Sequence, residues 1–264
     1  MEIPFSRWYE AIWIRRSRRL FDSRLIDPNT CERLHNVCKE FNPFSGVRAV
    51  FVNRPPDKVF KGILFHYGKI RGAPAIIAFI GDMGNPHIHE KLGYIGEGIV
   101  LEATALNLGT CWVGVSFKPK LVSSFITIKK SEKILAVTPV GYTREKWSLE
   151  EKIMTGFGRT HKRKHIEKLI KGKKDTSWPQ WVNTALEAAR VAPSAVNRQP
   201  WRFTVKSGSI TVSVNNLKDT LNISKRLDCG IAMLHIEVAS LQSGMRGAWD
   251  FLDSPHVARF SSVR

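Results

Sequence analysis

The chain has 264 residues, of which 43% are hydrophobic, and its 41 Lys and Arg residues exceed its 23 Asp and Glu residues to give a net charge of +18. This composition is ordinary for a globular protein with a sizeable core. No run of apolar residues approaches the roughly 20 that a membrane-spanning helix needs. The N-terminus carries arginines but no apolar signal core, so we expect a cytoplasmic protein. The four cysteines form no CxxC pair, which predicts buried thiols and no metal site.

The excess of basic residues favours phosphorylated ligands, nucleic acid or an anionic surface as partners. The densest basic segments are residues 15–19 and 159–174. Neither has the interleaved aromatic residues of a platform for single-stranded nucleic acid, so no specific nucleic-acid partner is expected. We interpret most of these charges as a solvated basic surface.

A first helix is predicted by Trp8, Ala11, Ile12 and Arg15, which recur on one helical face. It leads directly into the run Arg15-Arg16-Ser17-Arg18-Arg19. Cations are stabilised near the C-terminal end of a helix, so the run has a purely structural explanation. Arginine also offers a planar, bidentate donor to phosphate, so the run is also a candidate anion clamp.

Apolar periodicity predicts the elements that follow. Helices are expected from an N-cap at Asp27 and over residues 92–108, the second ending with Gly109 at the left-handed C′ position, and strands are expected over residues 47–52, 75–80, 110–115 and 134–140. Three glycines, Gly93, Gly96 and Gly98, fall inside the long helix, where each costs up to ~1 kcal/mol relative to Ala. They predict the close approach of another backbone or of a ligand.

Two histidines, His87 and His89, lie beside Glu90 before this long helix. On a strand the two rings could share a face. No third ligand stands at a usual spacing, so they are interpreted as loop and helix-start residues and no metal site is predicted.

The stretch from Ala192 to Trp201 (APSAVNRQPW) is a loop between two well-marked elements. Before it, a helix is predicted to begin with a capping box at residues 177–180. After it, residues 201–205 and 209–214 alternate as a hairpin. The two prolines bias Ala192 and Gln199 toward extended conformations. The residues alone leave open whether this is a binding loop or only a connection from helix to strand.

The segment APSAVNRQPWRF resembles the signature loop of the FMN-dependent nitroreductase family, in which the Pro-Ser pair and the Asn contact the flavin. The resemblance implies that Pro193, Ser194, Ala195 and Asn197 bind FMN. It is specific, because Pro, Ser, Asn, Gln, Pro and Trp all fall in the expected order.

The arginine run carries the same resemblance. A similar Arg-x-Ser-x-Arg run follows the family's first helix and holds the ribityl-phosphate and the pyrimidine ring of FMN. The resemblance implies that Arg15, Ser17 and Arg19 are contacts, with Arg16 and Arg18 on the opposite side. Arg16 is also included among the candidate cofactor-binding residues.

Two further segments resemble parts of the family's flavin site. The strand after the long helix resembles the family's segment at the same place, and this resemblance implies that backbone N–H groups of Gly114 or Val115 lie near flavin N5. The basic segment at 161–167 resembles a Lys-x-Arg-x-Pro run that grips the FMN phosphate, which implies contacts from Lys162 and Lys164. The chain departs from that pattern, because Lys164 replaces the Arg and His165 replaces the Pro.

An internal repeat is indicated by an offset of 135 residues, which pairs Leu92 with Leu227, Glu102 with Glu237 and Gly109 with Gly244. The first half has the Arg-x-Ser run and lacks the Pro-Ser-x-x-Asn loop, whereas the second half has the loop and lacks the run. Nitroreductases are usually homodimers in which these two motifs meet from different subunits. Two fused halves would imitate that dimer and form one composite FMN site.

We therefore expect an α+β protein with a nitroreductase-like α/β sandwich, in which two tandem half-repeats are fused into an intramolecular pseudo-dimer. The first half is predicted at residues 1–170, a linker at 171–176 and a second, shorter half at 177–264. Such a chain would act as a monomer.

The resemblance implies an FMN-dependent oxidoreductase that transfers hydride from NAD(P)H through flavin N5 to a nitroaromatic, a quinone or a similar small acceptor. Flavin chemistry is carried by the cofactor, so no catalytic side chain is named. Glu97, Glu102 and His235 lie in apolar helices, and nothing marks them as a general acid or base. A flavin-binding or storage protein without turnover is the alternative, and a basic nucleic-acid-binding protein is the third possibility. The sequence leaves open the acceptor and the choice between NADH and NADPH.

Overall fold

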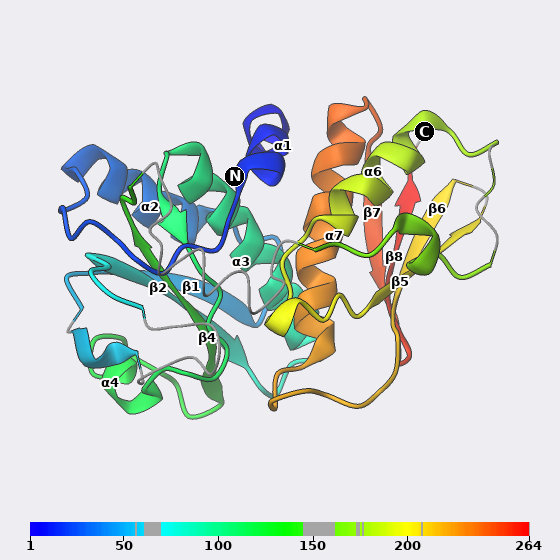
Figure 1. Ribbon diagram of the computed structural model, residues 1–264. Coiled ribbons are helices and arrows are strands. Elements are labelled where there is room, and N and C mark those ends of the chain that lie inside the picture. The colour runs from blue at the N-terminus through cyan, green and yellow to red at the C-terminus, as the bar shows by residue number, and fades with distance from the viewer. Residues whose placement is uncertain are drawn as a thin grey trace.

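The computed structural model describes residues 1–55, 57–60, 70–144, 162–172, 175, 177–206 and 208–263. The predicted basic segment at 159–174 and the predicted linker therefore lie partly outside the described residues. Figure 1 shows a first half in blue to green and a second half in yellow to red, with the helices α3 and α7 between their sheets.

Two antiparallel sheets with the same strand order form the framework. The first contains β1 (Val47–Asn53), β2 (Ala75–Asp82), β4 (Glu132–Gly141) and β3 (Gly109–Thr110) in that spatial order. The second contains β5 (Trp201–Lys206), β6 (Ser209–Val214), β8 (His256–Ser262) and β7 (Gly247–Phe251) in that order. The repeated topology confirms the predicted α+β fold of two similar halves, and the predicted hairpin is β5 and β6. The predicted central strand is β2, which pairs with β1 and β4 at its two edges. It is buried because its side chains alternate between two hydrophobic clusters, one on each face of the sheet.

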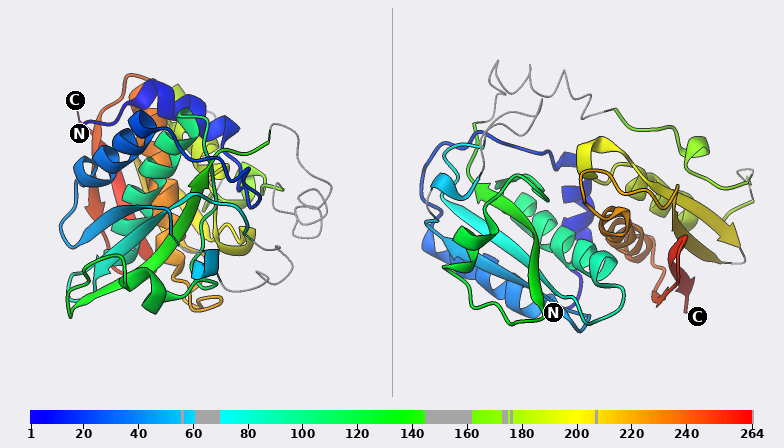
Figure 2. Two further views of the ribbon diagram at one scale, coloured as in Figure 1. Left: turned by 90° about the vertical axis from the view of Figure 1, so that its left-hand side faces the viewer. Right: turned by 90° about the horizontal axis from the view of Figure 1, so that it is seen from below.

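The helices cover and separate the two sheets. They are α1 (Phe5–Ile14), α2 (Pro28–Glu40), α3 (Ile88–Ala105), α4 (Pro119–Ser123), α6 (Gln180–Arg190) and α7 (Lys225–Gln242), with 3₁₀ turns at Asp57–Val59, Ile166–Lys168 and Ala195–Asn197. Seen from below, α3 and α7 lie side by side at the centre, with one sheet on the outer side of each (Figure 2). The molecule is thus layered as sheet, helix, helix and sheet.

Helix starts follow the sequence in one case and depart from it in another. Asp27 caps α2 as predicted, because its carboxylate accepts a 2.9 Å hydrogen bond from the Thr30 N–H. The predicted capping box of α6 is wrong. Pro179 is the N-cap of α6 and has no capping side chain, while the Ser177 N–H donates to Asp175 Oδ1 at 2.8 Å. The local Asx-type turn at Asp175 replaces the box.

The end of α3 also differs from the prediction. Gly109 lies in β3, and the left-handed residue after the helix is Asn107, with φ of 58°. Asparagine tolerates this conformation better than most residues, so a glycine is not needed there. The strand predicted over residues 110–115 is likewise shorter, since regular pairing stops at Thr110 and only an isolated bridge joins Val113 to Val137.

The two halves share one topology, but the predicted offset of 135 residues differs by two from the offset between their central helices. The helices begin at 88 and 225, and their left-handed C-terminal residues are Asn107 and Gly244, so both pairs are separated by 137 (225 − 88 and 244 − 107). Apolar residues are frequent in both helices, so several apolar residues coincide by chance when the two halves are aligned with an offset of 135. The helix boundaries show that the two halves align with an offset of 137.

Glycines let the two central helices approach closely. A Cβ atom on Gly93 of α3 would lie 3.0 Å from the carbonyl carbon of Leu227 and closer still to its oxygen, and a Cβ on Gly230 of α7 would lie 2.7 Å from the carbonyl carbon of Glu90. These two glycines are also 137 residues apart. Gly96 and Gly98 instead accommodate the side chains of Trp112 and Phe41. The predicted close approach is therefore packing within the protein.

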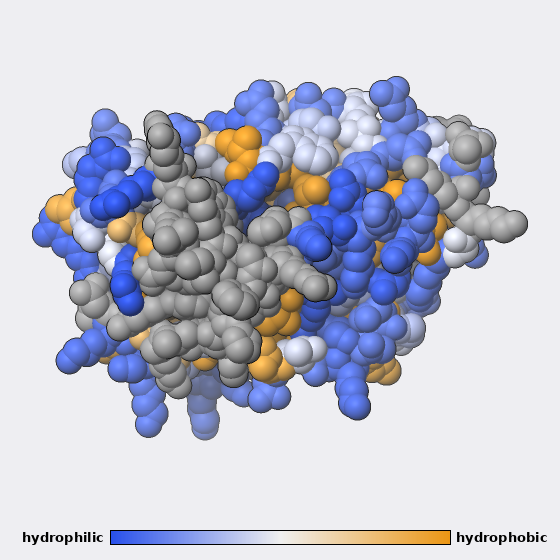
Figure 3. Space-filling view, in the orientation of Figure 1, coloured by the Kyte–Doolittle hydropathy of each residue, from blue (hydrophilic) through white to orange (hydrophobic). Residues whose placement is uncertain are grey.

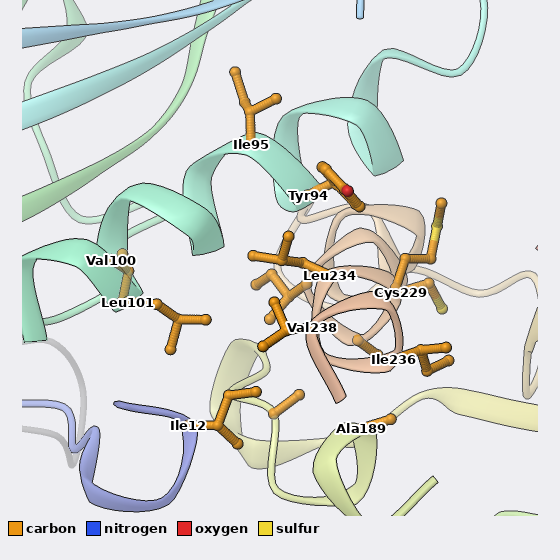
Figure 4. Close-up of a cluster of buried hydrophobic side chains, with 14 of the residues drawn as sticks. Ile12, Tyr94, Ile95, Val100, Leu101, Ala189, Cys229, Leu234, Ile236 and Val238 are labelled. Atoms are coloured by element: carbon orange, nitrogen blue, oxygen red, sulfur yellow. The ribbon is translucent and has the colours of Figure 1, made fainter. Parts of the chain in front are cut away.

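Around this interface the largest hydrophobic cluster joins both halves. Figure 4 shows side chains of α1, α3, α6 and α7 gathered about α7, among them Ile12, Leu101, Ala189, Leu234 and Val238. Cys38, Cys111 and Cys229 are buried and Cys31 is half-buried, all as free thiols, as the spacing predicted.

The outer surface in the orientation of Figure 3 is mainly hydrophilic, as the net charge of +18 predicts, with smaller hydrophobic areas between the polar side chains. Among the described residues, no helix is long and apolar enough to cross a membrane.

Candidate functional site

A cavity of about 730 Å³ lies between the two halves. This volume is within the range of roughly 300–1,000 Å³ that is usual for small-molecule sites. The first half lines it with residues at the end of α1, with the arginine run and with residues 111–116. The second half lines it with the end of α6, the 193–197 loop and the start of α7. We call this cavity the composite site.

The arginine run enters the composite site alongside β3. Ser17 forms a parallel bridge to Thr110, and the Arg18 N–H donates to the Thr110 carbonyl at 2.7 Å. Arg15, Arg16, Ser17 and Arg19 line the cavity, and Arg18 does not. The prediction that Arg16 lies on the opposite side is wrong, because the chain turns at Arg15 and the Arg16 guanidinium folds back to the carbonyls of Trp13 and Arg15.

Residues 111–116 form the adjoining wall. Gly114 and Val115 both line the cavity. The space beside Gly114 is filled by Ile223 of the second half, whose Cδ1 would lie 2.8 Å from an added Cβ. A side chain at position 114 would therefore press on a second residue of the cavity wall.

The loop of the second half is folded tightly by its own polar groups. Pro193, Ser194, Ala195 and Asn197 all line the cavity. The Ser194 hydroxyl accepts a 2.9 Å hydrogen bond from the Gln199 N–H. Gln199 has φ of 47°, so the predicted extended conformation before Pro200 is wrong. Asn197 is also left-handed, with φ of 54°, and the polar side chains of Ser194, Asn197 and Gln199 make hydrogen bonds that hold this turn.

Asp228 of α7 fastens the loop to the central helix. Its Oδ1 accepts from the Ala195 N–H at 3.1 Å, and its Oδ2 lies 2.6 Å from Arg198 Nε. Burial raises the pKa of Asp228 to about 6, although Arg198 and the Ala195 hydrogen bond oppose that rise. Sequence reasoning did not identify this residue.

The basic segment at 162–164 differs in detail from the prediction. Lys162 and Lys164 do not line the cavity, whereas Arg163 between them does. Lys164 Nζ donates to the carbonyls of Arg198 and Gln199, and the Lys162 carbonyl accepts from Asn197 Nδ2 at 2.8 Å. Asn197 Oδ1 accepts from Arg163 Nη1 at 2.8 Å. The usefulness of arginine as a bidentate anion donor is the signal that could have identified Arg163.

The cavity gathers positive charge. Five arginines line it, namely Arg15, Arg16, Arg19, Arg163 and Arg190, and Asp228 is the only acidic residue among the lining residues of the described chain. Burial, with added repulsion from Arg15, Arg16 and Arg190, lowers the pKa of Arg163 to about 10. Burial also lowers the pKa of Arg15, although Glu97 opposes this shift. Clustered, desolvated guanidiniums make the site suited to an anion.

Other features suit a ligand with a flat apolar part. Ile12, Trp112, Val113, Leu227 and Ile231 provide apolar surface in the same cavity. Arg15 is 5% exposed, and its Nε donates no hydrogen bond within the described part of the chain. An unsatisfied buried donor, neighbouring cations and apolar walls together fit a phosphorylated aromatic compound such as FMN.

The part of the chain that the structure describes contains no cluster of three or more potential metal ligands. His87 is the N-cap of α3, and its Nδ1 lies 2.9 Å from Glu90 Oε1, in accord with the predicted helix start.

The two-sheet fold is that of a nitroreductase-like protein. The family model described as "Putative TM nitroreductase" matches residues 7–240, and the chain belongs to this family. No curated protein sequence matches the chain.

Among solved structures, a "putative nitroreductase" from Thermotoga maritima has a TM-score of 0.65 and 21% sequence identity, over 96% of this chain and 92% of that chain. It has the same fold over nearly the whole length. A nitroreductase with bound FMN from Bacteroides fragilis has a TM-score of 0.43 and 16% identity, over 54% of this chain and 91% of that chain. An FMN-dependent nitroreductase from Clostridium difficile has a TM-score of 0.44 and 18% identity, over 52% of this chain and 88% of that chain.

Proposed function

We propose that this chain binds one FMN in the composite site and is an NAD(P)H-dependent oxidoreductase for small aromatic acceptors such as nitroaromatics or quinones. The observation that carries the proposal is the arrangement of the two predicted motifs. Ser17 of the arginine run and Ser194 and Asn197 of the loop, far apart in sequence, line one cavity. Membership of the nitroreductase family supports the same assignment.

Different residues of the cavity wall would bind different parts of the cofactor. The guanidiniums of Arg15, Arg19 and Arg163 supply positive charge and forked donors for the phosphate and for the polar edge of the flavin. The apolar walls at Trp112 and Ile231 would exclude water from the flavin ring. When bound, FMN would supply hydride acceptance from NAD(P)H and transfer of electrons to the acceptor.

One FMN per chain is the proposed stoichiometry. The first half carries aromatic side chains after α2, where the second half has its loop after α6. Phe44 packs against Tyr94 with ring centroids 5.1 Å apart and against Phe251 with centroids 5.2 Å apart. These contacts fill the region near the start of α3 with the chain's own rings. The chain is accordingly proposed to act as a monomer whose two halves replace the two subunits of a dimer.

Purification and anaerobic reduction test the proposal. The expected protein retains or rebinds one FMN per chain, and NADPH or NADH bleaches the flavin absorbance in the absence of oxygen. A bound flavin that neither nucleotide reduces would favour the storage alternative. No flavin binding, together with salt-sensitive binding to random DNA, would overturn both flavin functions in favour of a nucleic-acid-binding protein. A stoichiometry of two would overturn the composite site.

A further inference from the structure

A chain of buried polar groups crosses from α7 to α3 directly behind the composite site. Glu97 of α3 and His235 of α7 have no exposed surface, and Glu97 Oε1 lies 3.0 Å from His235 Nε2. Glu97 Oε2 accepts a 2.8 Å hydrogen bond from Trp112 Nε1. Arg15 Nε lies 3.7 Å from Glu97 Oε1. Glu97 therefore contacts two residues that line the cavity, Arg15 and Trp112, while remaining outside it.

His235 is held between two hydrogen-bond acceptors. Its Nδ1 lies 2.8 Å from the Ala188 carbonyl oxygen. Ala188 belongs to the last turn of α6, which ends at Arg190, so its carbonyl is among the four that lack a partner within the helix. A carbonyl can only accept, so His235 Nδ1 carries a proton. His235 Nε2 faces a carboxylate, which also only accepts when it is ionised.

Two groups beside this ring interact favourably with a cation. The C-terminal end of a helix stabilises a cation, and His235 lies at that end of α6. The Glu97 carboxylate is its other neighbour. Beside an ionised Glu97, both ring nitrogens would donate, His235 would be an imidazolium, and Arg15, Glu97 and His235 together would carry one net positive charge. An anion in the cavity would compensate that charge.

We propose that Glu97 and His235 form a buried carboxylate–imidazolium pair that positions Arg15 on the wall of the composite site. Without the charge on His235, Glu97 would have Arg15 as its single cationic partner and would draw the guanidinium away from the cavity. The pair also links the two sides of the site, because α6 carries the loop of the second half and Arg15 begins the arginine run of the first. The identity of the ligand that Arg15 holds, FMN, rests on the proposed function.

The first test needs no flavin. Nuclear magnetic resonance of the protein labelled with ¹⁵N-histidine, at pH 7, should show one buried ring with both nitrogens protonated. In Glu97→Gln that ring should become neutral and keep its proton on Nδ1, because the glutamine amide can donate to Nε2. The same change assigns the signal to His235. A neutral His235 ring in the wild-type protein would overturn the pair.

The second test measures the dissociation constant of FMN for the flavin-free protein by fluorescence quenching. His235→Gln and Glu97→Gln should each weaken FMN binding by about tenfold to a hundredfold, the effect expected for loss of a hydrogen bond to a charged group. His35→Gln is the matched control, since His35 is exposed on α2, and it should bind FMN like the wild type. The near-isosteric Glu97→Gln keeps the test decisive if His235→Gln fails to fold.

The outcomes separate this inference from the proposed function. Affinities within twofold of the wild type in variants with native circular dichroism would overturn the positioning role. A wild-type protein that binds no FMN would refute the proposed function, while the state of the His235 ring would still decide whether the pair exists.

Discussion

The glycine contact between α3 and α7 gives the most direct test of the pseudo-dimer interface. We expect Gly93→Ala and Gly230→Ala each to destabilise the protein, although alanine is favoured over glycine in a helix by about 1 kcal/mol. The added Cβ at 93 would lie 3.0 Å from the Leu227 carbonyl carbon, and that at 230 would lie 2.7 Å from the Glu90 carbonyl carbon. Carbon atoms pack favourably at about 3.5–4.0 Å. Backbone atoms cannot rotate away, so the helices must separate.

Separation of the helices costs packing across the whole central cluster. Overpacking of this kind costs typically about 1–3 kcal/mol and occasionally more, so we expect a net loss of that order after the gain in helix propensity is included. One outward movement of α7 relieves both contacts. The double variant should therefore cost less than the sum of the two single variants, which is the sign of coupled sites.

Denaturant unfolding followed by tryptophan fluorescence and circular dichroism measures these free energies. Gly84→Ala is the control, because the nearest atom to its added Cβ is Asp82 Oδ1 at 3.5 Å, an ordinary contact. Its midpoint should stay close to that of the wild type. If Gly93→Ala or Gly230→Ala were as stable as the wild type, the close approach of the two helices would be refuted. Full additivity would refute the shared movement.

Three further predictions concern contacts that join the two halves or shape the site. Arg226→Met should cost about 3–5 kcal/mol of unfolding free energy in denaturant titrations, because it leaves the carboxylate of Glu90, whose side chain is 1% exposed, without its guanidinium partner. Asn197→Ala should weaken FMN binding about tenfold in fluorescence titrations, since it removes the acceptor that holds Arg163 at the cavity. Asp228 should make stability depend on pH. Its folded pKa of about 6 exceeds the ordinary value of 3.8, so its stabilising contribution is complete below about pH 4 and is lost as the pH rises through 6. Relative to Asp228→Asn, the wild type should lose about 3 kcal/mol over that window in urea titrations.

Matched variants check these three expectations. Arg190→Met removes a partly exposed pair with Glu187 and should cost at most about 1 kcal/mol. Asn215→Ala changes an exposed asparagine and should leave FMN affinity unchanged. Equal losses in Arg226→Met and Arg190→Met would contradict the burial argument. A stability difference between wild type and Asp228→Asn that stays constant from pH 4 to pH 7 would contradict the titration of Asp228.

The sequence by itself determined several local elements and the two segments that line the composite site. Apolar periodicity located α1, α2, β2, β4 and the β5–β6 hairpin, because burial of one face imposes a pattern that survives in the chain. Its resemblance to nitroreductases also identified the Ser17 and Ser194 segments, which meet in one cavity. These motifs were recognisable because each lies within a few consecutive residues.

Tertiary structure decided the features that depend on contacts between distant residues. Apolar side chains could not distinguish an offset of 135 from 137, whereas the opposed positions of Gly93 and Gly230 could. Arg163 enters the cavity and Lys164 does not, because Asn197 and the loop carbonyls hold them in those places. His235 gave no functional signal in an apolar helix. The role proposed for His235 depends on two contacts that only the fold creates. Its Nε2 faces Glu97, 138 residues away in the chain, and its Nδ1 faces the Ala188 carbonyl at the end of α6.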